Sequence, residues 1–101
     1  MKRIVQYKVK PERVADNERY VRAVYEELHR ARPPGLRYAT FRLPDGQSFI
    51  HLVSNEEADG ANPLTALPAF KAFLAELRER CETPPVTTDL EEIGSYGVFD
   101  R

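Results

Sequence analysis

The sequence lacks most of the features that specialised protein classes require. It has a single cysteine, Cys81, so no disulfide can form within the chain, and we expect a reducing compartment such as the cytoplasm. Its 15 basic and 16 acidic side chains give a net charge of −1, which argues against a nucleic-acid-binding protein, because binding to phosphates requires an excess of Lys and Arg. No apolar run approaches the ~20 residues that span a bilayer, so we expect no membrane segment.

Several kinds of site are missing as well. The five glycines are scattered, so the chain has no glycine-rich phosphate loop. Two histidines and one cysteine lack the spacing of a zinc site, and the acidic stretch around Glu56, Glu57 and Asp59 lacks the spaced ligands of a calcium loop. Lys2 and Arg3 precede a run that is too short and too polar for a signal peptide. We therefore predict neither a metal nor a cofactor.

The 101 residues suffice for one domain, 1–101, with one hydrophobic core. Apolar alternation predicts four strands, over 3–9, 36–43, 48–54 and 86–96. Apolar residues at helical spacing predict helices over 16–32 and 63–81, with 63–66 as a separate turn, and Asp16 is a candidate N-cap. The pairs Pro33-Pro34 and Pro84-Pro85 are expected to end these helices. Pro44-Asp45-Gly46 predicts a tight turn, and 55–62 an acidic loop.

The resulting order is βαββαβ. Two βαβ halves joined by a hairpin predict an α+β, ferredoxin-like fold, in which two helices cover one face of an antiparallel four-stranded sheet. The RNA-recognition module shares this order, but its third strand carries a basic, glycine and aromatic pattern that FIHLV (49–53) does not have.

The strands also predict how the protein assembles. In two of three strands the residues on both faces are mainly apolar, whereas a sheet with one solvated face should alternate between apolar and polar residues. Two helices can cover only one face, and the uncovered face of four strands measures about 350 Å². An apolar area of that order is near the upper limit for a monomer. We therefore predict an isologous homodimer that pairs through the open sheet face.

Three stretches carry a resemblance to a known superfamily: IVQYKVKP (4–11), FRLPDGQSF (41–49) and LPAFKAF (67–73). With the order of its elements, the whole chain resembles the dimeric α/β-barrel superfamily and, within it, the antibiotic-biosynthesis-monooxygenase-like (ABM-like) proteins. The resemblance implies that two sheets pair into an α/β barrel and that a pocket lies between sheet and helices in each subunit. Haem-degrading members rely on a Trp and a helix-borne His, and this chain has no Trp and no His on its second helix.

Eight residues are candidates for a site. His51 lies in the middle of a strand on an apolar face, where an imidazole can act as a general acid or base near neutral pH. Tyr7 and Tyr38 point from strands and could donate a hydrogen bond to a phenol or quinone oxygen. Packing in the core is the alternative for all three. The candidates for substrate binding are four aromatic residues and one basic residue: Phe41, Phe49, Phe70, Phe73 and Arg37.

The resemblance implies a cofactor-independent monooxygenase that acts on a small aromatic or quinol-type compound. The alternative is a non-catalytic dimer that binds a small apolar ligand or takes part in a stress response. Fold alone does not choose between these functions.

Overall fold

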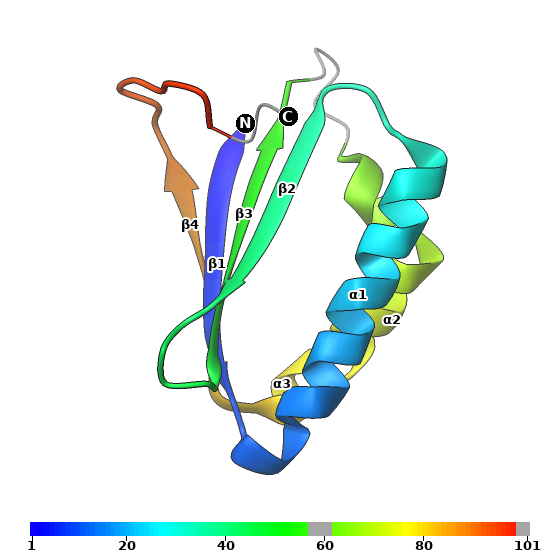
Figure 1. Cartoon of the computed structure of the whole chain (residues 1–101), viewed down its shortest axis with the longest axis vertical. Coiled ribbons are helices and arrows are strands. Elements are labelled where there is room, and N and C mark those ends of the chain that lie inside the picture. Colours follow the sequence, from blue (N-terminus) through cyan, green and yellow to red (C-terminus); the bar gives the residue numbers. More distant parts are fainter. Residues whose placement is uncertain (57–61, 99–101) are drawn as a thin grey trace.

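The structure, a computed structural model, describes residues 1–56 and 62–98 (Figure 1). Residues 57–61 of the predicted acidic loop and the last three residues lie outside the described part. Four strands form one antiparallel sheet in the order β2-β3-β1-β4. They are β1 (Lys2–Val9), β2 (Leu36–Arg42), β3 (Ser48–Asn55) and β4 (Cys81–Leu90). The helices are η1 (Pro11–Arg13), α1 (Val14–Ala31), η2 (Pro63–Ala66), α2 (Pro68–Ala75) and α3 (Leu77–Arg80).

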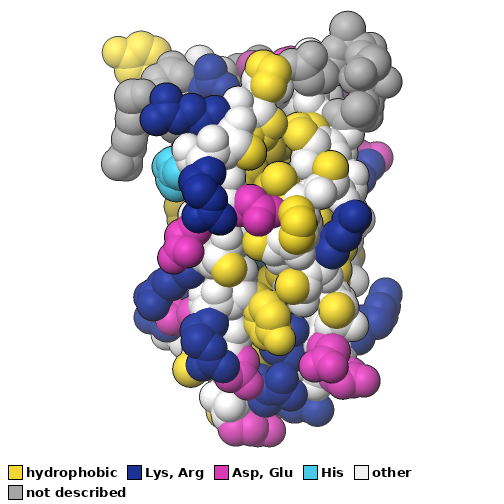
Figure 2. All heavy atoms as spheres, turned by 90° about the vertical axis from the view of Figure 1, so that its right-hand side faces the viewer, with side chains coloured by type: hydrophobic (Ala, Val, Ile, Leu, Met, Phe, Trp, Pro, Cys, Tyr) yellow, Lys and Arg dark blue, Asp and Glu magenta, His cyan; other side chains and the backbone are white. Residues whose placement is uncertain are grey.

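The helices form one layer against one face of the sheet, and the other face carries no helix (Figure 1). This arrangement confirms the predicted ferredoxin-like α+β fold. On the outer surface of the helix layer, charged side chains lie along the margins and hydrophobic side chains form a band along the middle (Figure 2). Within 1–56 and 62–98, no helix is both long and apolar enough to cross a membrane.

Helix α1 begins and ends at proline-containing segments. It starts at Val14, directly after the 3-10 turn that Pro11 opens, so the prediction that Asp16 is the N-cap was wrong. Asp16 lies in the first turn instead, where a carboxylate favours the helix dipole, and pairs with Arg13 at 2.9 Å. Arg32 closes the helix in the left-handed conformation (φ 45°), and Pro33-Pro34 follow as predicted.

The second helical region is divided, as the position of Pro68 indicated. The 3-10 turn η2 is capped by Asn62, whose side chain accepts a hydrogen bond from the backbone N–H of Leu64 at 3.0 Å. Pro68 then opens α2, where its missing N–H costs nothing. Glu76 interrupts the helix at φ −129°, and the short α3 completes the segment.

Strand β4 differs from the prediction. It begins at Cys81, so Pro84-Pro85 lie inside the strand instead of ending the helix, and it stops at Leu90 instead of Tyr96. The prolines are tolerated because β4 is an edge strand and because its register with β1 shifts between the partners of Gln6 and Lys8.

The register divides the sheet into a covered face, under the helices, and an open face. The covered face carries the hydrophobic core, which includes Tyr7, Val9 and Phe49. The predicted alternation of β2 and β3 is correct: Tyr38 lies opposite Val53, and both belong to the covered face. The open face carries the apolar residues Ile4, Ala39, Phe41, Ile50, Leu52, Val86 and Leu90 together with the polar residues Lys2, Gln6, Lys8, Arg37, Ser54 and Thr88.

Candidate functional site

A cavity of about 570 Å³ lies between the covered face and α2. This volume is within the range of pockets that bind small molecules. Leu64, Phe70 and Phe73 line it from the helix layer, and Tyr38 and His51 line it from the sheet. Because β4 includes the two prolines, Pro85 reaches this cavity too. The cavity therefore combines an aromatic wall with a small polar area.

His51 is the centre of that polar area. It is buried, and both of its ring nitrogens have partners. Nε2 lies 2.7 Å from the Tyr7 hydroxyl, and Nδ1 lies 2.5 Å from the Tyr38 hydroxyl and 3.2 Å from Thr40 Oγ1. The hydroxyl of Tyr25 contacts Thr40 Oγ1 at 2.8 Å. Strands β1 and β2 thus place hydroxyl groups around one imidazole, which β3 carries.

The polar contacts continue away from the cavity into the core. Asn17 of α1 donates from Nδ2 to the Tyr7 hydroxyl at 2.9 Å, and Arg80 of α3 donates from Nε to Asn17 Oδ1 at 3.2 Å. Arg80 also donates to the carbonyl of Phe73 at 2.7 Å, and its guanidinium lies 4.5 Å from the ring centre of Tyr20. We call Arg80, Asn17, Tyr7, His51 and Tyr38 the hydrogen-bonded series.

Burial keeps the tyrosines and the histidine of this series neutral. It lowers the pKa of His51 from 6.5 to about 4, because a charged imidazolium would lose its hydration. Burial also raises the pKa of Tyr7 and of Tyr38 far above the ordinary value of a phenol. At neutral pH the site therefore contains hydroxyl groups and an uncharged imidazole.

The sequence proposed His51, Tyr7 and Tyr38 separately as catalytic candidates, and the structure places both tyrosine hydroxyls in contact with the His51 ring. Phe70 and Phe73, proposed for substrate binding, line the cavity.

The other three candidates lie elsewhere. Phe49 packs behind Tyr7, with ring centres 5.6 Å apart. Phe41 and Arg37 are on the open face, because neighbouring residues of β2 alternate and Tyr38 occupies the covered face.

Sequence reasoning missed Asn17 and Arg80. Both interrupt apolar helical stripes: Asn17 lies between Val14 and Val21 of α1, and Arg80 follows Phe73 and Leu77 at spacings of seven and three. A polar residue within such a stripe was the available signal, because that face of the helix is buried.

Among the described residues, no group of three or more His, Cys, Asp or Glu side chains could hold a metal ion. Cys81 is buried, and burial raises the pKa of its thiol, so it has little thiolate character at neutral pH.

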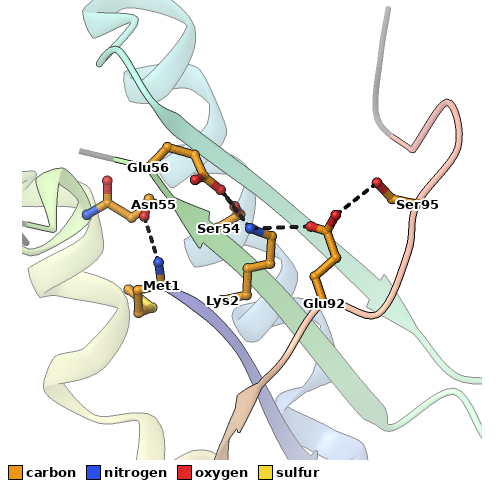
Figure 3. Close-up of polar contacts among 7 residues, drawn as sticks. All are labelled: Met1, Lys2, Ser54, Asn55, Glu56, Glu92 and Ser95. Atoms are coloured by element: carbon orange, nitrogen blue, oxygen red, sulfur yellow. Dashed lines mark hydrogen bonds and ion pairs between the residues drawn. The ribbon is translucent and has the colours of Figure 1, made fainter. Parts of the chain in front are cut away.

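A second hollow, of about 640 Å³, lies on the open face between the sheet and the segment after β4. Lys2 ties this segment to the sheet, since its Nζ lies 2.7 Å from Glu56 and 3.4 Å from Glu92 (Figure 3). Ser95 donates a further hydrogen bond to Glu92 at 3.2 Å, and the terminal amine of Met1 donates to the Asn55 carbonyl at 2.9 Å (Figure 3). Arg37 lines this hollow, not the cavity beside His51.

Comparison with known proteins gives similarity in structure but not in sequence. No protein-family model matches the chain, and no curated protein matches it significantly. A solved antibiotic biosynthesis monooxygenase is 15% identical, with a TM-score of 0.75 over 92% of this chain and 98% of that chain. A Nitrosomonas europaea protein, provisionally named an antibiotic biosynthesis monooxygenase, is also 15% identical, with a TM-score of 0.75 over 91% and 88% of the two chains.

A conserved protein from Methanosarcina mazei Go1 is similar too. It is 18% identical, and it superimposes with a TM-score of 0.69 over 86% of this chain and 87% of that one. Identities this low show the fold and leave the reaction open. The chain therefore has the fold of the ABM-like structures, as the resemblance of its sequence predicted.

Proposed function

We propose that the cavity between the sheet and α2 binds a small aromatic compound of the phenol or quinol type and that the protein oxidises this compound with O₂, without a metal or a flavin. The observation that carries the proposal is the cavity itself: its aromatic wall suits a planar ring, and Tyr38 and His51 supply polar groups from the sheet that can orient a ligand. Arg3, Glu76 and Arg78 are among the charged residues that also line the cavity. The fold shared with a solved antibiotic biosynthesis monooxygenase supports this class of reaction.

The proposed reaction needs little from the protein. The organic compound loses two hydrogen atoms and gains one oxygen atom, and the second atom of O₂ leaves as water, so O₂ is the only oxidant. The substrate first loses a proton to water, and the resulting electron-rich anion reacts with O₂. A hydrogen bond from the Tyr38 hydroxyl to the substrate oxygen would stabilise that anion in a site from which water is largely excluded.

His51 is better suited to support Tyr38 than to remove a proton itself. Both of its ring nitrogens are engaged, and the lowering of its pKa to about 4 makes the imidazole a weak base at neutral pH. We therefore assign substrate contact to Tyr38 and assign to His51 and Tyr7 the role of holding the Tyr38 hydroxyl in place.

Oxygen uptake tests the proposal. A panel of hydroquinones and anthrones should include at least one compound that the protein oxidises with consumption of O₂. Tyr38→Phe removes only the hydroxyl and should lower the rate about 100-fold. The matched control is Tyr96→Phe, which removes a hydroxyl from a side chain that is 98% exposed and should leave the rate unchanged. Equal rates in the wild type and in Tyr38→Phe, or no uptake with any compound, would contradict the proposal.

One observation favours binding without chemistry as the second candidate. The polar groups around His51 already satisfy one another, so the cavity could retain an apolar ligand with no reacting group. Native mass spectrometry of the purified protein would show a retained ligand of defined mass, and such a ligand recovered chemically unchanged in the presence of O₂ would favour this function.

We also propose that two copies pair through the open face. Val86 is 61% exposed and Phe41 is 50% exposed on this face, although both are large and apolar. In the segment after β4, Ile93 is 94% exposed, a position that a partner subunit would cover. Light scattering at micromolar concentration should give twice the 11.6 kDa mass of the chain, and a mass of one chain would contradict the dimer.

A further inference from the structure

The hydrogen-bonded series connects a buried cation to the cavity through four consecutive contacts. Arg80 Nε to Asn17 Oδ1 is 3.2 Å, and Asn17 Nδ2 to Tyr7 Oη is 2.9 Å. Tyr7 Oη to His51 Nε2 is 2.7 Å, and His51 Nδ1 to Tyr38 Oη is 2.5 Å. Arg80, Asn17, Tyr7 and His51 are buried, and the series ends at Tyr38, which lines the cavity together with Tyr7 and His51.

The cation fixes the direction of every hydrogen bond in the series. A guanidinium can only donate, so the amide oxygen of Asn17 must face Arg80, and its N–H groups must face Tyr7. The Tyr7 oxygen accepts from Asn17, which leaves the Tyr7 proton to be donated to His51 Nε2. Because Nε2 accepts, the neutral ring carries its proton on Nδ1 and donates it to Tyr38.

The opposite direction leaves a buried hydroxyl without an acceptor. If Nε2 carried the proton, Tyr7 would accept from both His51 and Asn17, and its own proton would have no acceptor among its contacts with the described residues. Tyr7 is 2% exposed, and a hydroxyl this deeply buried normally donates its proton to an acceptor. The Tyr38 hydroxyl borders the cavity, and its proton can be donated to a ligand.

We propose that Arg80 and Asn17 are positioning residues that hold His51 in the Nδ1–H form, so that Tyr38 presents its O–H to the cavity and the site takes a ligand oxygen that accepts, such as a phenolate, an enolate or a quinone carbonyl. The choice of ligand rests on the proposed function, since it assumes that the cavity is the binding site. The state of His51 does not rest on it.

The charge of Arg80 favours the same class of ligand. Among the described residues no acidic side chain pairs with Arg80, whose direct partners are an amide oxygen, a backbone carbonyl and the faces of two aromatic rings. Its Nη1 is buried without a hydrogen-bond partner. This uncompensated positive charge, relayed by the oriented dipoles of Asn17 and Tyr7, would stabilise an anionic oxygen at Tyr38.

Nitrogen NMR tests the state of His51 directly. The chain has two histidines, so His29→Gln leaves a single imidazole to observe. The ¹⁵N shifts of His51 should show a protonated Nδ1 and an unprotonated Nε2 at neutral pH. The Nε2–H form would overturn the inference, whether or not the protein oxidises any compound.

Asn17→Asp should reverse the donor and acceptor roles between Tyr7, His51 and Tyr38, because Asp has the same size and shape as Asn. A carboxylate at this position accepts from both Arg80 and the Tyr7 hydroxyl, so Tyr7 would accept from Nε2–H and Tyr38 would donate to Nδ1. The ¹⁵N shifts of the two ring nitrogens should therefore exchange. The matched control is Asn62→Asp, which makes the same chemical change at the cavity rim, where Asn62 caps η2 and does not touch the series. Unchanged shifts in a folded Asn17→Asp protein would overturn the inference.

Binding of 4-nitrophenol, whose phenolate absorbs visible light, tests the ligand class without turnover. The wild type should bind the phenolate, and Asn17→Asp should bind it about 10-fold more weakly. Equal affinity in Asn17→Asp and the wild type would overturn the ligand class.

A second variant covers the case in which Asn17→Asp does not fold. Tyr7→Phe interrupts the series, and His51 should then populate both neutral forms, whereas retention of a single Nδ1–H form would overturn the inference. If wild-type His51 has the expected form and binds the phenolate but no quinol consumes O₂, the proposed function fails and the inference stands.

Discussion

The two faces of the sheet reverse the usual distribution of polar and apolar groups. Under the helices, where apolar side chains are expected, the hydrogen-bonded series crosses the core and ends at a cavity. On the open face, where polar side chains are expected, Phe41, Val86 and Leu90 remain substantially exposed. A buried polar group costs free energy unless it is hydrogen-bonded, and an exposed apolar group costs free energy unless a partner covers it. The proposed ligand site rests on the first feature and the proposed dimer on the second.

The polar groups of the covered face and the apolar groups of the open face differ in whether the subunit itself satisfies them. On the covered face the polar groups satisfy one another, so this face is complete within one chain except at Tyr38 and at Arg80 Nη1. On the open face nothing within the described residues covers the centre of the sheet. Mutations on the covered face should therefore act on stability and ligand binding, and mutations on the open face should act on assembly.

The largest effect is expected from Arg80→Ala. It leaves Asn17 Oδ1 and the Phe73 carbonyl without their donor and opens a cavity, which together should lower the free energy of unfolding by about 4 kcal/mol. Urea denaturation measures this change. Arg78→Ala, at an exposed position of the same short helix, should change the free energy by less than about 0.5 kcal/mol, and equal effects of the two substitutions would contradict a structural role for Arg80.

The second effect is a dependence of stability on pH through His51. Burial lowers its pKa from 6.5 to about 4, so between these values the unfolded chain binds a proton that the folded protein does not. Stability therefore falls as the pH decreases from 6.5 towards 4, by up to about 3 kcal/mol.

Urea denaturation at several pH values from about 7 to about 5 measures the slope. In His51→Gln the free energy of unfolding should no longer fall with pH through this residue. In His29→Gln, which changes an exposed position late in α1, the fall should remain. Parallel pH profiles for His51→Gln and the wild type would show that His51 titrates normally in the folded protein.

The third effect concerns the open face. Leu52→Glu places a charge at the centre of this face and, in an isologous dimer, places two charges near one axis, so the dissociation constant should rise about 100-fold. Sedimentation or light scattering over a dilution series measures it. Ala72→Glu, at an exposed position of α2, is the matched control and should leave assembly unchanged. Dissociation of both variants at the same concentration would argue for an interface that does not involve the open face.

Local sequence patterns predicted the two faces but not the series that crosses the core. Alternation separated Tyr38 from Phe41 and His51 from Ile50, because each strand has only two sides, but the fold was needed to show which side the helices cover. The apolar stripe of Phe73 and Leu77 indicates that Arg80 is buried, but its partner Asn17 lies 63 residues away along the chain, so no local pattern identifies their hydrogen bond. The position of Pro84-Pro85 inside β4 was missed for a similar reason. Prolines can end a helix or lie in an edge strand, and only the order of strands in the folded sheet shows that β4 is at the edge.

The smallest effect is expected at the turn between β2 and β3, on which both faces depend. The Asp45 carboxylate accepts hydrogen bonds from the Ser48 hydroxyl at 2.6 Å, the Ser48 N–H at 2.8 Å and the Gln47 N–H at 2.9 Å, and Gly46 adopts φ 76°. These bonds, the Ser48 hydroxyl first, lower the pKa of Asp45 from 3.8 to about 2.

The stabilising contribution of Asp45 is therefore complete above pH 3.8 and is lost as the pH falls through about 2. Asp45→Ala should lower the thermal midpoint slightly near neutral pH, and the difference from the wild type should shrink as the pH falls towards 2 and vanish below it. Asp45→Asn, which keeps one accepting oxygen, should lie between the two. A difference that persists at the lowest pH would mean that the ionised carboxylate does not stabilise the turn. Since a shift of one residue in this hairpin would exchange the two faces of β2, the turn determines which side of the sheet receives Tyr38 and which receives Phe41.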